Sequence, residues 1–277
     1  TKRARQRPGK KEEKEGGKGE EEEGTARDAP IPGRWQVLPD HPTGSAAILV
    51  NREGQNQSIV TLGANEHLAP DFVQAQSAAF AGASVVLLQL ETRIEAVQSA
   101  LAEAAQHEVP CILNPAPFDA ALDAEILRPC RLVTPNETEF ALLLRHLAGI
   151  EVAADRIADL ADPELHALCR KLPAATVIIT LGKRGCYVSH ADSQRRMSDT
   201  TAHYRVAAEK VNAIDTTGAG DAFNGALAAA LTRWPESPLQ KCVRHASRAA
   251  ALSTERTGAA DSMVSFEDVV KRFGSSE

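Results

Sequence analysis

From about residue 85 onward, short apolar runs alternate with longer segments in which apolar residues recur every three or four positions. Unbroken apolar runs predict buried strands, whereas the 3.6-residue period predicts helices with one face on a core. The predicted strands are 85–90, 111–113, 132–134 and 176–180, and the predicted helices are 92–107, 122–127, 137–147, 156–171 (interrupted by Pro163), 219–231, 239–253 and about 266–273. Segments 186–189 and 203–206 are expected to add antiparallel strands. This alternation is typical of an α/β fold, with a mostly parallel sheet covered by helices on both faces.

The N-terminal part of the sequence has a different pattern. Residues 1–34 are mainly Lys, Arg, Glu and Gly, and they include four consecutive glutamates at 20–23. Such a segment has almost no apolar side chains to bury, so we predict a disordered charged tail over residues 1–40 and a folded domain over 41–277. A nuclear-localisation signal at residues 2–5 is the weaker alternative. Residues 46–50 and 57–61 are predicted to pair as two strands around a turn at 51–54.

Composition and charge narrow the class of protein. The chain has 277 residues, 43% of them hydrophobic but only 4% aromatic, and a net charge of −6. An acidic chain with few aromatic side chains to stack on bases is not expected to bind nucleic acid. The sequence contains no apolar run of the roughly 18 residues that a membrane span needs, so no membrane association is expected. Its five cysteines are widely spaced, which favours reduced thiols and a cytoplasmic location.

A glycine-rich turn, Asp215-Thr216-Thr217-Gly218-Ala219-Gly220-Asp221, directly precedes a predicted helix of small residues. Such a turn directs several backbone N–H groups and the positive end of the helix dipole at one point, which favours an anion. A carboxylate at that point would repel a phosphate unless it accepts a proton from a hydroxyl that attacks the phosphate. The spacing fits neither a P-loop nor a dinucleotide fingerprint. From local chemistry alone, an ordinary turn with an Asp cap is the alternative.

Polar residues gather where the predicted strands end. The four clusters are Gln89-Leu90-Glu91-Thr92, Asn114-Pro115-Ala116-Pro117, Pro135-Asn136-Glu137-Thr138-Glu139 and Leu181-Gly182-Lys183-Arg184-Gly185. The carboxyl ends of parallel strands meet at one edge of a sheet, so these clusters predict one site there. Asn136 and Glu139 also have the spacing of a helix cap, and Lys183 and Arg184 could equally be solvated turn residues.

From about Thr43 onward, the chain resembles the ribokinase-like carbohydrate kinase family. The segments that carry the resemblance, in family order, are Thr43-Gly44-Ser45-Ala46-Ala47-Ile48-Leu49-Val50-Asn51, Gln89-Leu90-Glu91, residues 114–117, residues 135–139, Thr180-Leu181-Gly182 and residues 215–221. The resemblance implies a three-layer α/β/α fold with a small β lid, to which residues 44–62 would contribute strands. It also implies ATP-dependent phosphorylation of D-ribose to D-ribose 5-phosphate, with another sugar or a nucleoside as the alternative substrate.

The resemblance also implies roles for individual residues. Asp221 would be the catalytic base and contact the sugar, Glu91 would also contact the sugar, and Glu139 would organise Mg²⁺ through water. The anion hole would comprise Gly218, Ala219 and Gly220. Nucleotide contacts would come from Asn136, Thr180, Gly182, Gly185 and Ser247. Relatives often carry Asn in place of Ser247. An activating K⁺ would be held by Asp215, Thr217, Ser253, Arg256, Gly258 and Ser262, largely through backbone carbonyls.

One part of the family pattern is not recognisable in this sequence. Family members have a long segment before the strand at 44–50, which supplies sugar-binding residues and a Gly-Gly-Lys-Gly-Ala-Asn element. Gly16-Gly17-Lys18-Gly19 matches only the first four letters of that element and is followed by glutamates. We therefore expect a chain that lacks the N-terminal third of the family domain, and an inactive nucleotide-binding remnant is kept as an alternative. Family members commonly form homodimers through their lid strands.

Overall fold

The computed structural model describes residues 32–50, 56–193 and 197–274. The chain divides into two units, Thr1–Trp35 and Gln36–Glu277, and every helix and strand of the described residues belongs to the second. Most of the predicted charged tail, and the predicted turn at 51–54, lie outside the described residues.

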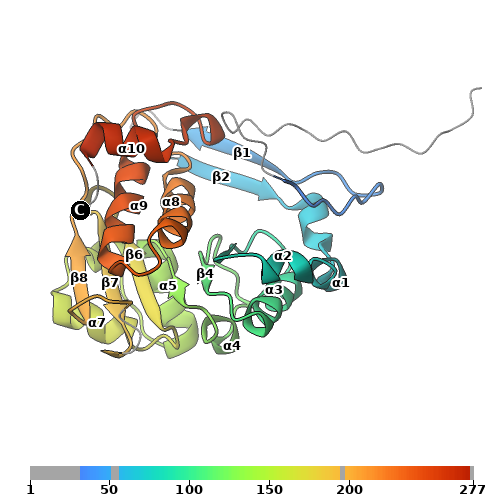
Figure 1. Cartoon of the computed structure of the whole chain (residues 1–277), viewed down its shortest axis with the longest axis horizontal. Coiled ribbons are helices and arrows are strands. Elements are labelled where there is room, and N and C mark those ends of the chain that lie inside the picture. The colour runs from blue at the N-terminus through green and yellow to red at the C-terminus, as the bar shows by residue number, and fades with distance from the viewer. Residues whose placement is uncertain (1–31, 51–55, 194–196, 275–277) are drawn as a thin grey trace, which may run out of the picture. The chain divides into compact units, whose positions relative to one another are not determined.

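A six-stranded sheet forms the centre of the second unit (Figure 1). Its strands, in spatial order, are β3 (Val86–Leu88), β4 (Cys111–Leu113), β5 (Leu132–Val133), β6 (Thr176–Thr180), β7 (Cys186–His190) and β8 (His203–Val206). Strands β3 to β6 pair in parallel, whereas β7 and β8 add antiparallel strands beyond β6. This arrangement confirms the predicted α/β fold and places the carboxyl ends of β3 to β6 at one edge.

Alternate residues of each strand face two separate apolar cores. Leu113 and Val177 pack into one core, while their neighbours Ile112 and Ile178 pack into the other. The first core is covered by α3 (Ile94–Gln106), α4 (Ala124–Leu127), α5 (Glu137–Ala148), α6 (Ala154–Ile157) and α7 (Asp162–Cys169). The second is covered by α8 (Ala219–Arg233) and α9 (Leu239–Ser253). Because the side-chain period of a strand is two, this alternation produces the helix–sheet–helix layers visible in Figure 1.

A separate two-stranded sheet precedes the central one. Strands β1 (Ser45–Val50) and β2 (Asn56–Thr61) pair antiparallel, with Ser45 opposite Thr61. Ile59 and Val60 of this hairpin are 60% and 46% exposed. Three short helices that the sequence patterns did not predict lead from it to β3: η1 (Gly63–His67), α1 (Pro70–Gln74) and α2 (Ser77–Ala81).

The helix predicted over 156–171 is two helices, so that prediction was wrong in detail. Pro163 lies in the first turn of α7, where no backbone N–H is needed, and does not interrupt a helix. The break comes earlier, because the Arg205 guanidinium binds the carbonyl oxygens of Ala158 and Leu160 at 3.2 and 2.9 Å. These carbonyls therefore turn toward β8 instead of continuing a helix.

The remaining C-terminal elements are η2 (Gly182–Arg184), η4 (Ala260–Ser262) and α10 (Phe266–Phe273). Helix α10 packs on α9 through a small cluster formed by Val269, Ala249 and Leu252. Within the described part of the chain, no helix has the length and apolar character that crossing a bilayer requires.

Candidate active site

The polar clusters predicted at the strand ends meet at one edge of the sheet. Asn136, just beyond β5, forms a parallel bridge with Thr180, the last residue of β6. The Thr180 backbone N–H donates to the Pro135 carbonyl at 2.9 Å. The structure thus brings together two residues that were predicted to contact nucleotide, Asn136 and Thr180.

Asn136 and Glu139 form a reciprocal cap at the start of α5. The Asn136 side chain accepts a hydrogen bond from the Glu139 backbone N–H, and the Glu139 carboxylate accepts bonds from the Asn136 backbone and side-chain amides, all at 2.8 Å. Burial raises the pKa of Glu139 to about 7, in spite of these stabilising bonds. The capping alternative is therefore correct as a description of the contacts, and it leaves a carboxylate that ionises near neutral pH at the strand ends.

The glycine-rich turn leads directly into α8. Gly218 has a φ of 75°, and a Cβ at this position would lie 3.2 Å from the Met263 side chain and 3.3 Å from the Ala259 Cα. The turn therefore packs against the loop that follows α9. Only glycine combines this backbone conformation with so close an approach.

The first turn of α8 presents two unpaired backbone donors beside a carboxylate. Of the predicted anion-hole residues, Ala219 donates its N–H to the Thr216 carbonyl at 3.2 Å. The N–H groups of Gly220 and Asp221 donate to no partner among the residues described by the structure. Asp221 is exposed on one side, yet the protein packed around it raises the pKa of its carboxyl by desolvation.

A chain of buried hydrogen bonds joins α8 to the strand ends. The Thr134 hydroxyl, just beyond β5, donates to the Asn224 side-chain oxygen at 2.7 Å, and the Asn224 side-chain amide donates to the Gly220 carbonyl at 3.0 Å. The Asn114 side chain, just beyond β4, donates to the Thr134 carbonyl at 2.9 Å. Thr134 was not among the predicted site residues, although it is the last residue of the predicted strand 132–134.

Two loops that were predicted to hold a cation are tied together by Asp215. One oxygen of its carboxylate accepts the Thr217 N–H, and the other accepts the Gly258 N–H, both at 2.9 Å. These bonds lower the pKa of Asp215. The Ile214 N–H adds a bond to the Thr254 carbonyl at 2.8 Å. The Asp215 carboxylate therefore serves the loops themselves, which leaves carbonyl oxygens as the groups available for a cation.

Other predicted cation residues use their side chains locally. The Ser253 and Ser262 hydroxyls donate to the carbonyls of Ala250 and Ala259, at 2.8 and 2.7 Å. The Arg256 guanidinium reaches the Met263 carbonyl and the Asp268 carboxylate, at 3.4 and 3.5 Å. A cation role for these three residues would therefore rest on their backbone.

The predicted nucleotide edge continues from β6 into the turn before β7. Gly185 has a φ of 87°, and a Cβ there would overlap the Val206 carbonyl oxygen. The loop after β8 is in turn linked to α9 by an ion pair between Glu209 and Arg248, 2.8 Å long. Ser247, next to Arg248, is 8% exposed. The loop after β8 thus packs against Gly185 and is joined to the residue that follows Ser247.

Two charged side chains of the predicted strand-end clusters, Arg184 and Glu91, form no hydrogen bond or ion pair with the other candidate site residues in the described part of the chain. Arg184 pairs with Asp159, so it anchors the turn before β7 to the segment between α6 and α7. Glu91 lies beyond β3 and is exposed, and it makes no hydrogen bond or ion pair with any of the described residues. A sugar contact for Glu91 therefore stays a prediction.

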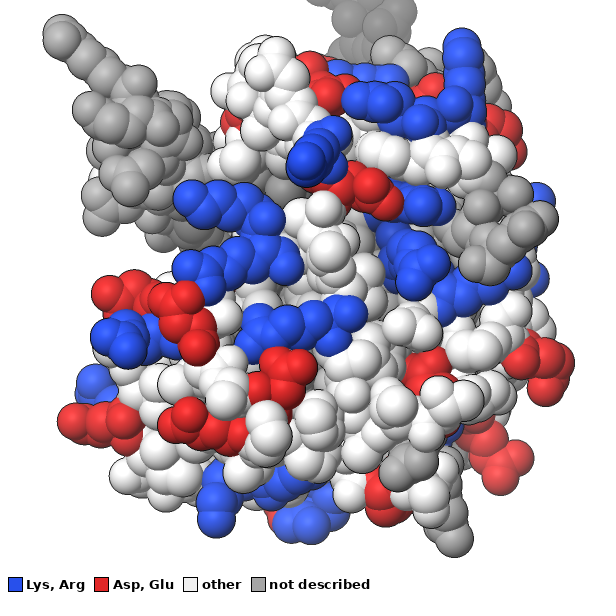
Figure 2. Space-filling model, turned by 90° about the vertical axis from the view of Figure 1, so that its left-hand side faces the viewer, with Lys and Arg blue, Asp and Glu red and all other residues white. Residues whose placement is uncertain are grey.

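Charge is unevenly distributed over the surface. Figure 2 shows the face that lies on the left of Figure 1, where Lys and Arg side chains gather in a band across its upper and middle part. This concentration contrasts with the net charge of −6 of the whole chain. A local excess of positive charge favours approach of an anionic ligand from that side.

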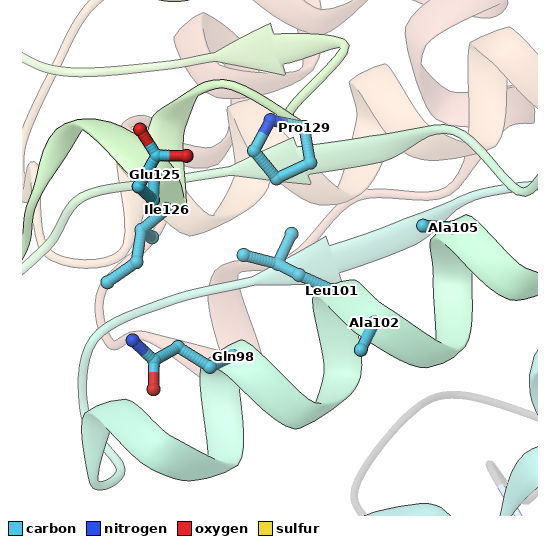
Figure 3. Close-up of a pocket in the computed structure, with 7 residues that line it drawn as sticks. All are labelled: Gln98, Leu101, Ala102, Ala105, Glu125, Ile126 and Pro129. Atoms are coloured by element: carbon cyan, nitrogen blue, oxygen red, sulfur yellow. The ribbon is translucent and has the colours of Figure 1, made fainter.

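Outside this site, a small hollow of about 240 Å³ lies between α3 and α4 (Figure 3). Its lining is largely apolar, including Leu101 and Ile126, and its one carboxylate, Glu125, pairs with Arg128 at 3.1 Å. None of its lining residues belongs to the strand-end clusters, the glycine-rich turn or the two loops joined by Asp215.

Sequence comparison decides the family. The sequence matches the pfkB family of carbohydrate kinases over residues 19–265. The chain belongs to the pfkB family. The pfkB relatives include ribokinases of Staphylococcus aureus, 37% identical over 82% of this chain and 68% of the relative, and of Schizosaccharomyces pombe, 34% identical over 82% and 66%. The chain thus spans about two thirds of the length of these relatives.

Solved structures of pfkB kinases share the fold. A ribokinase structure from Giardia lamblia superposes with a TM-score of 0.74 at 28% identity, covering 88% of this chain and 76% of its own. An Arabidopsis thaliana ribokinase complexed with ribose and ATP superposes with a TM-score of 0.65 at 27% identity, covering 84% and 69%. These superpositions confirm the ribokinase-like α/β fold that the sequence motifs predicted.

Proposed function

We propose that this chain transfers the terminal phosphoryl group of ATP to the 5-hydroxyl of D-ribose, giving D-ribose 5-phosphate. The observation that carries the proposal is the position of Asp221, beside the unpaired N–H groups in the first turn of α8. Support comes from relatives named ribokinase in bacteria, yeast and mouse, 34–37% identical. A solved relative, from Arabidopsis thaliana, is complexed with ribose and ATP.

Asp221 acts as the general base in this proposal. Its carboxylate accepts the proton of the attacking hydroxyl, and its raised pKa strengthens it as a base. The N–H groups of Gly220 and Asp221, with the positive end of the α8 dipole, stabilise the charge on the transferred phosphoryl group. A positioned general base of this kind contributes about 10²–10⁴ in rate.

The residues present fit a water-mediated Mg²⁺. Mg²⁺ in kinases keeps several waters and is bound through one or two carboxylates and the substrate phosphates. Glu139 offers such a carboxylate, and its oxygens are oriented by Asn136. No group of three or more His, Cys, Asp or Glu residues suited to direct metal binding occurs in the described ranges. When bound with ATP, Mg²⁺ would neutralise developing phosphate charge.

The residues present also fit a K⁺ ion held by the two loops that Asp215 joins. Backbone carbonyl oxygens are the ligands that replace water around K⁺. The carbonyl oxygens of Thr217 and Gly258 accept no hydrogen bond from the described residues, and Asp215 brings their two segments together. Bound there, K⁺ would fix the loop against which Gly218 packs, and with it the start of α8.

Two further features complete the proposal. All five cysteines are free and buried, which supports a cytoplasmic location for the enzyme.

A second candidate substrate is 2-deoxy-D-ribose, because deoxyribokinases of Salmonella are 31% identical over 70% of this chain. These two sugars differ by one hydroxyl, so the choice between them depends on contacts around the 2-position.

A substrate comparison tests the proposed function. The purified full chain, with Mg²⁺, K⁺ and ATP, is assayed on D-ribose, 2-deoxy-D-ribose, D-fructose and inosine, and ³¹P NMR identifies the phosphorylated position. The highest kcat/KM is expected for D-ribose, with phosphate on the 5-oxygen. A preference for another substrate would reassign the enzyme within its family. No turnover on any of them, with Mg·ADP binding retained, would indicate an inactive nucleotide-binding protein and contradict the proposal.

A further inference from the structure

Buried polar groups outside the glycine-rich turn form hydrogen bonds that support the first turn of α8. Thr134 and Asn224 are each 1% exposed and Asn114 is 8% exposed; the Asn114 side chain donates to the Thr134 carbonyl, and the Thr134 hydroxyl donates to the Asn224 side chain. Buried polar groups are costly unless fully bonded, so such a chain has one strongly preferred arrangement. Its end point is the Gly220 carbonyl, in the peptide unit directly before Asp221.

The orientation of the Asn224 amide depends on Thr134. The Thr134 hydroxyl donates to Asn224 Oδ1 at 2.7 Å, while its other possible acceptor, the Leu113 carbonyl, is 3.5 Å away. Because Oδ1 faces the hydroxyl, Nδ2 faces the Gly220 carbonyl and donates to it. Without the hydroxyl, Asn224 would lose the partner that distinguishes its oxygen from its nitrogen, and a rotated amide would place two oxygens face to face.

We propose that Thr134 is a positioning residue for phosphoryl transfer, which acts through Asn224 to fix the Gly220–Asp221 peptide and the Asp221 carboxylate. The proposal rests on the proposed function and adds to it a residue just beyond β5. Thr134 touches no reacting atom. It determines where the base and the two unpaired N–H groups stand, and small displacements of such groups reduce turnover strongly.

The test compares two substitutions at one position. Thr134→Val keeps the shape and removes the hydroxyl, whereas Thr134→Ser keeps the hydroxyl. For Thr134→Val we expect kcat on D-ribose to fall at least about tenfold, with KM for ATP and D-ribose changed less than about twofold. Thr134→Ser should restore kcat to within about threefold of the unmodified chain. Thr232→Val is the matched control, since the Thr232 hydroxyl donates to the Ala228 carbonyl on the exposed side of the same helix.

A second readout does not depend on activity. The Ala222 N–H donates to the Gly218 carbonyl at 2.8 Å, which is the first i→i−4 hydrogen bond of α8, and its hydrogen exchange reports opening of that turn. Exchange at Ala222 should be at least about tenfold faster in Thr134→Val than in Thr134→Ser or Thr232→Val. If the unmodified chain has no kinase activity, the proposed function fails while this comparison still tests the positioning role. Unchanged exchange at Ala222, or equal kcat values for Thr134→Val and Thr134→Ser, would overturn the proposal.

Discussion

The Asp215 carboxylate accepts the backbone N–H of Gly258 at 2.9 Å, which ties together two loops 43 residues apart in the sequence. Its other oxygen holds the Thr217 N–H at the same distance. An asparagine has only one acceptor oxygen and cannot keep both bonds. Asp215 is therefore expected to control the geometry of the carbonyl oxygens proposed to hold K⁺.

We predict that Asp215→Asn raises the K⁺ concentration for half-maximal activity by about tenfold or more, as expected when an outer partner of a metal site is lost. Activity at saturating K⁺ should recover in large part. The measurement is kinase activity against KCl concentration. Asp261→Asn, which removes the same charge from an exposed position of the second loop, is the control. Identical K⁺ dependence of the two variants would argue against a cation site at these loops.

Glu139 gives the proposed Mg²⁺ site a pH dependence. Its pKa in the folded protein is about 7, so its carboxylate is largely protonated below that pH. The Mg²⁺ concentration for half-maximal activity should therefore rise by up to about tenfold per pH unit below 7 and level off above it. Glu139→Gln cannot ionise, so its Mg²⁺ requirement should be higher and should lack this pH-dependent component. Equal slopes for the two proteins between pH 6 and 8 would exclude Glu139 as the titrating group.

The same ionisation has a consequence for stability. The folded pKa of Glu139 is raised, so between about 4.5 and 7 the folded state binds more protons than the unfolded state. The Glu139 contribution to the free energy of unfolding therefore falls as pH rises through this interval and is constant above it.

Gly185 and Gly182 differ in the space around them, although both have positive φ. A Cβ at Gly185 would overlap the Val206 carbonyl, whereas a Cβ at Gly182 meets no atom within 4 Å. Gly185→Ala should lower the free energy of unfolding by about 2–5 kcal/mol, from backbone strain and overpacking together. Gly182→Ala should lower it by only about 1 kcal/mol, from strain alone. Urea denaturation measures both, and similar losses would mean that the turn before β7 relaxes freely.

His245 should make the protein less stable in mild acid. Burial lowers its pKa, Arg248 and Arg233 lower it further, and its Nδ1 has no hydrogen-bond partner among the described residues. The unfolded chain therefore takes up the proton first as pH falls below about 6.5, and the free energy of unfolding falls by up to about 1.4 kcal/mol per pH unit.

Replacing His245 by phenylalanine tests this effect. The ring stacks on Phe266 with 4.7 Å between centroids, so His245→Phe keeps an aromatic packing partner and removes the titration. The melting temperature of the variant should exceed that of the unmodified chain by a margin that grows from pH 7.5 to pH 5. A margin that stays constant over this range would show that His245 does not titrate between the folded and unfolded states.

Strong periodic signals predicted the fold well. The bounds of β6 and α9 agree with the prediction, because an unbroken apolar run and a clear 3.6-residue period leave little ambiguity. Helices α1 and α2 were missed because each is only five residues long, too short to show a period. The break between α6 and α7 depends on Arg205, a residue more than 40 positions away, so no local pattern could indicate it.

In the candidate site too, local sequence patterns predicted some contacts, whereas contacts that depend on tertiary packing were missed. Polar residues at strand ends predicted that the cluster around Asn136 would meet the end of strand 176–180, since parallel strands bring their carboxyl ends together, and Asn136 does pair with Thr180. The bond between Thr134 and Asn224 joins residues 90 positions apart and depends on how α8 packs on β5. Packing of this kind is set by the whole core, and so the sequence pattern contained no signal for it.

Asp221 is proposed to remove the proton of the attacking hydroxyl, and the direct test is ATP-dependent phosphorylation of D-ribose by the unmodified chain and by Asp221→Asn. We expect turnover by the unmodified chain and a loss of at least about 10² in kcat for the variant. Both the unmodified chain and Asp221→Asn should still bind Mg·ADP, as measured by calorimetry. An Asp221→Asn variant that phosphorylates D-ribose at the unmodified rate would show that Asp221 is not the general base.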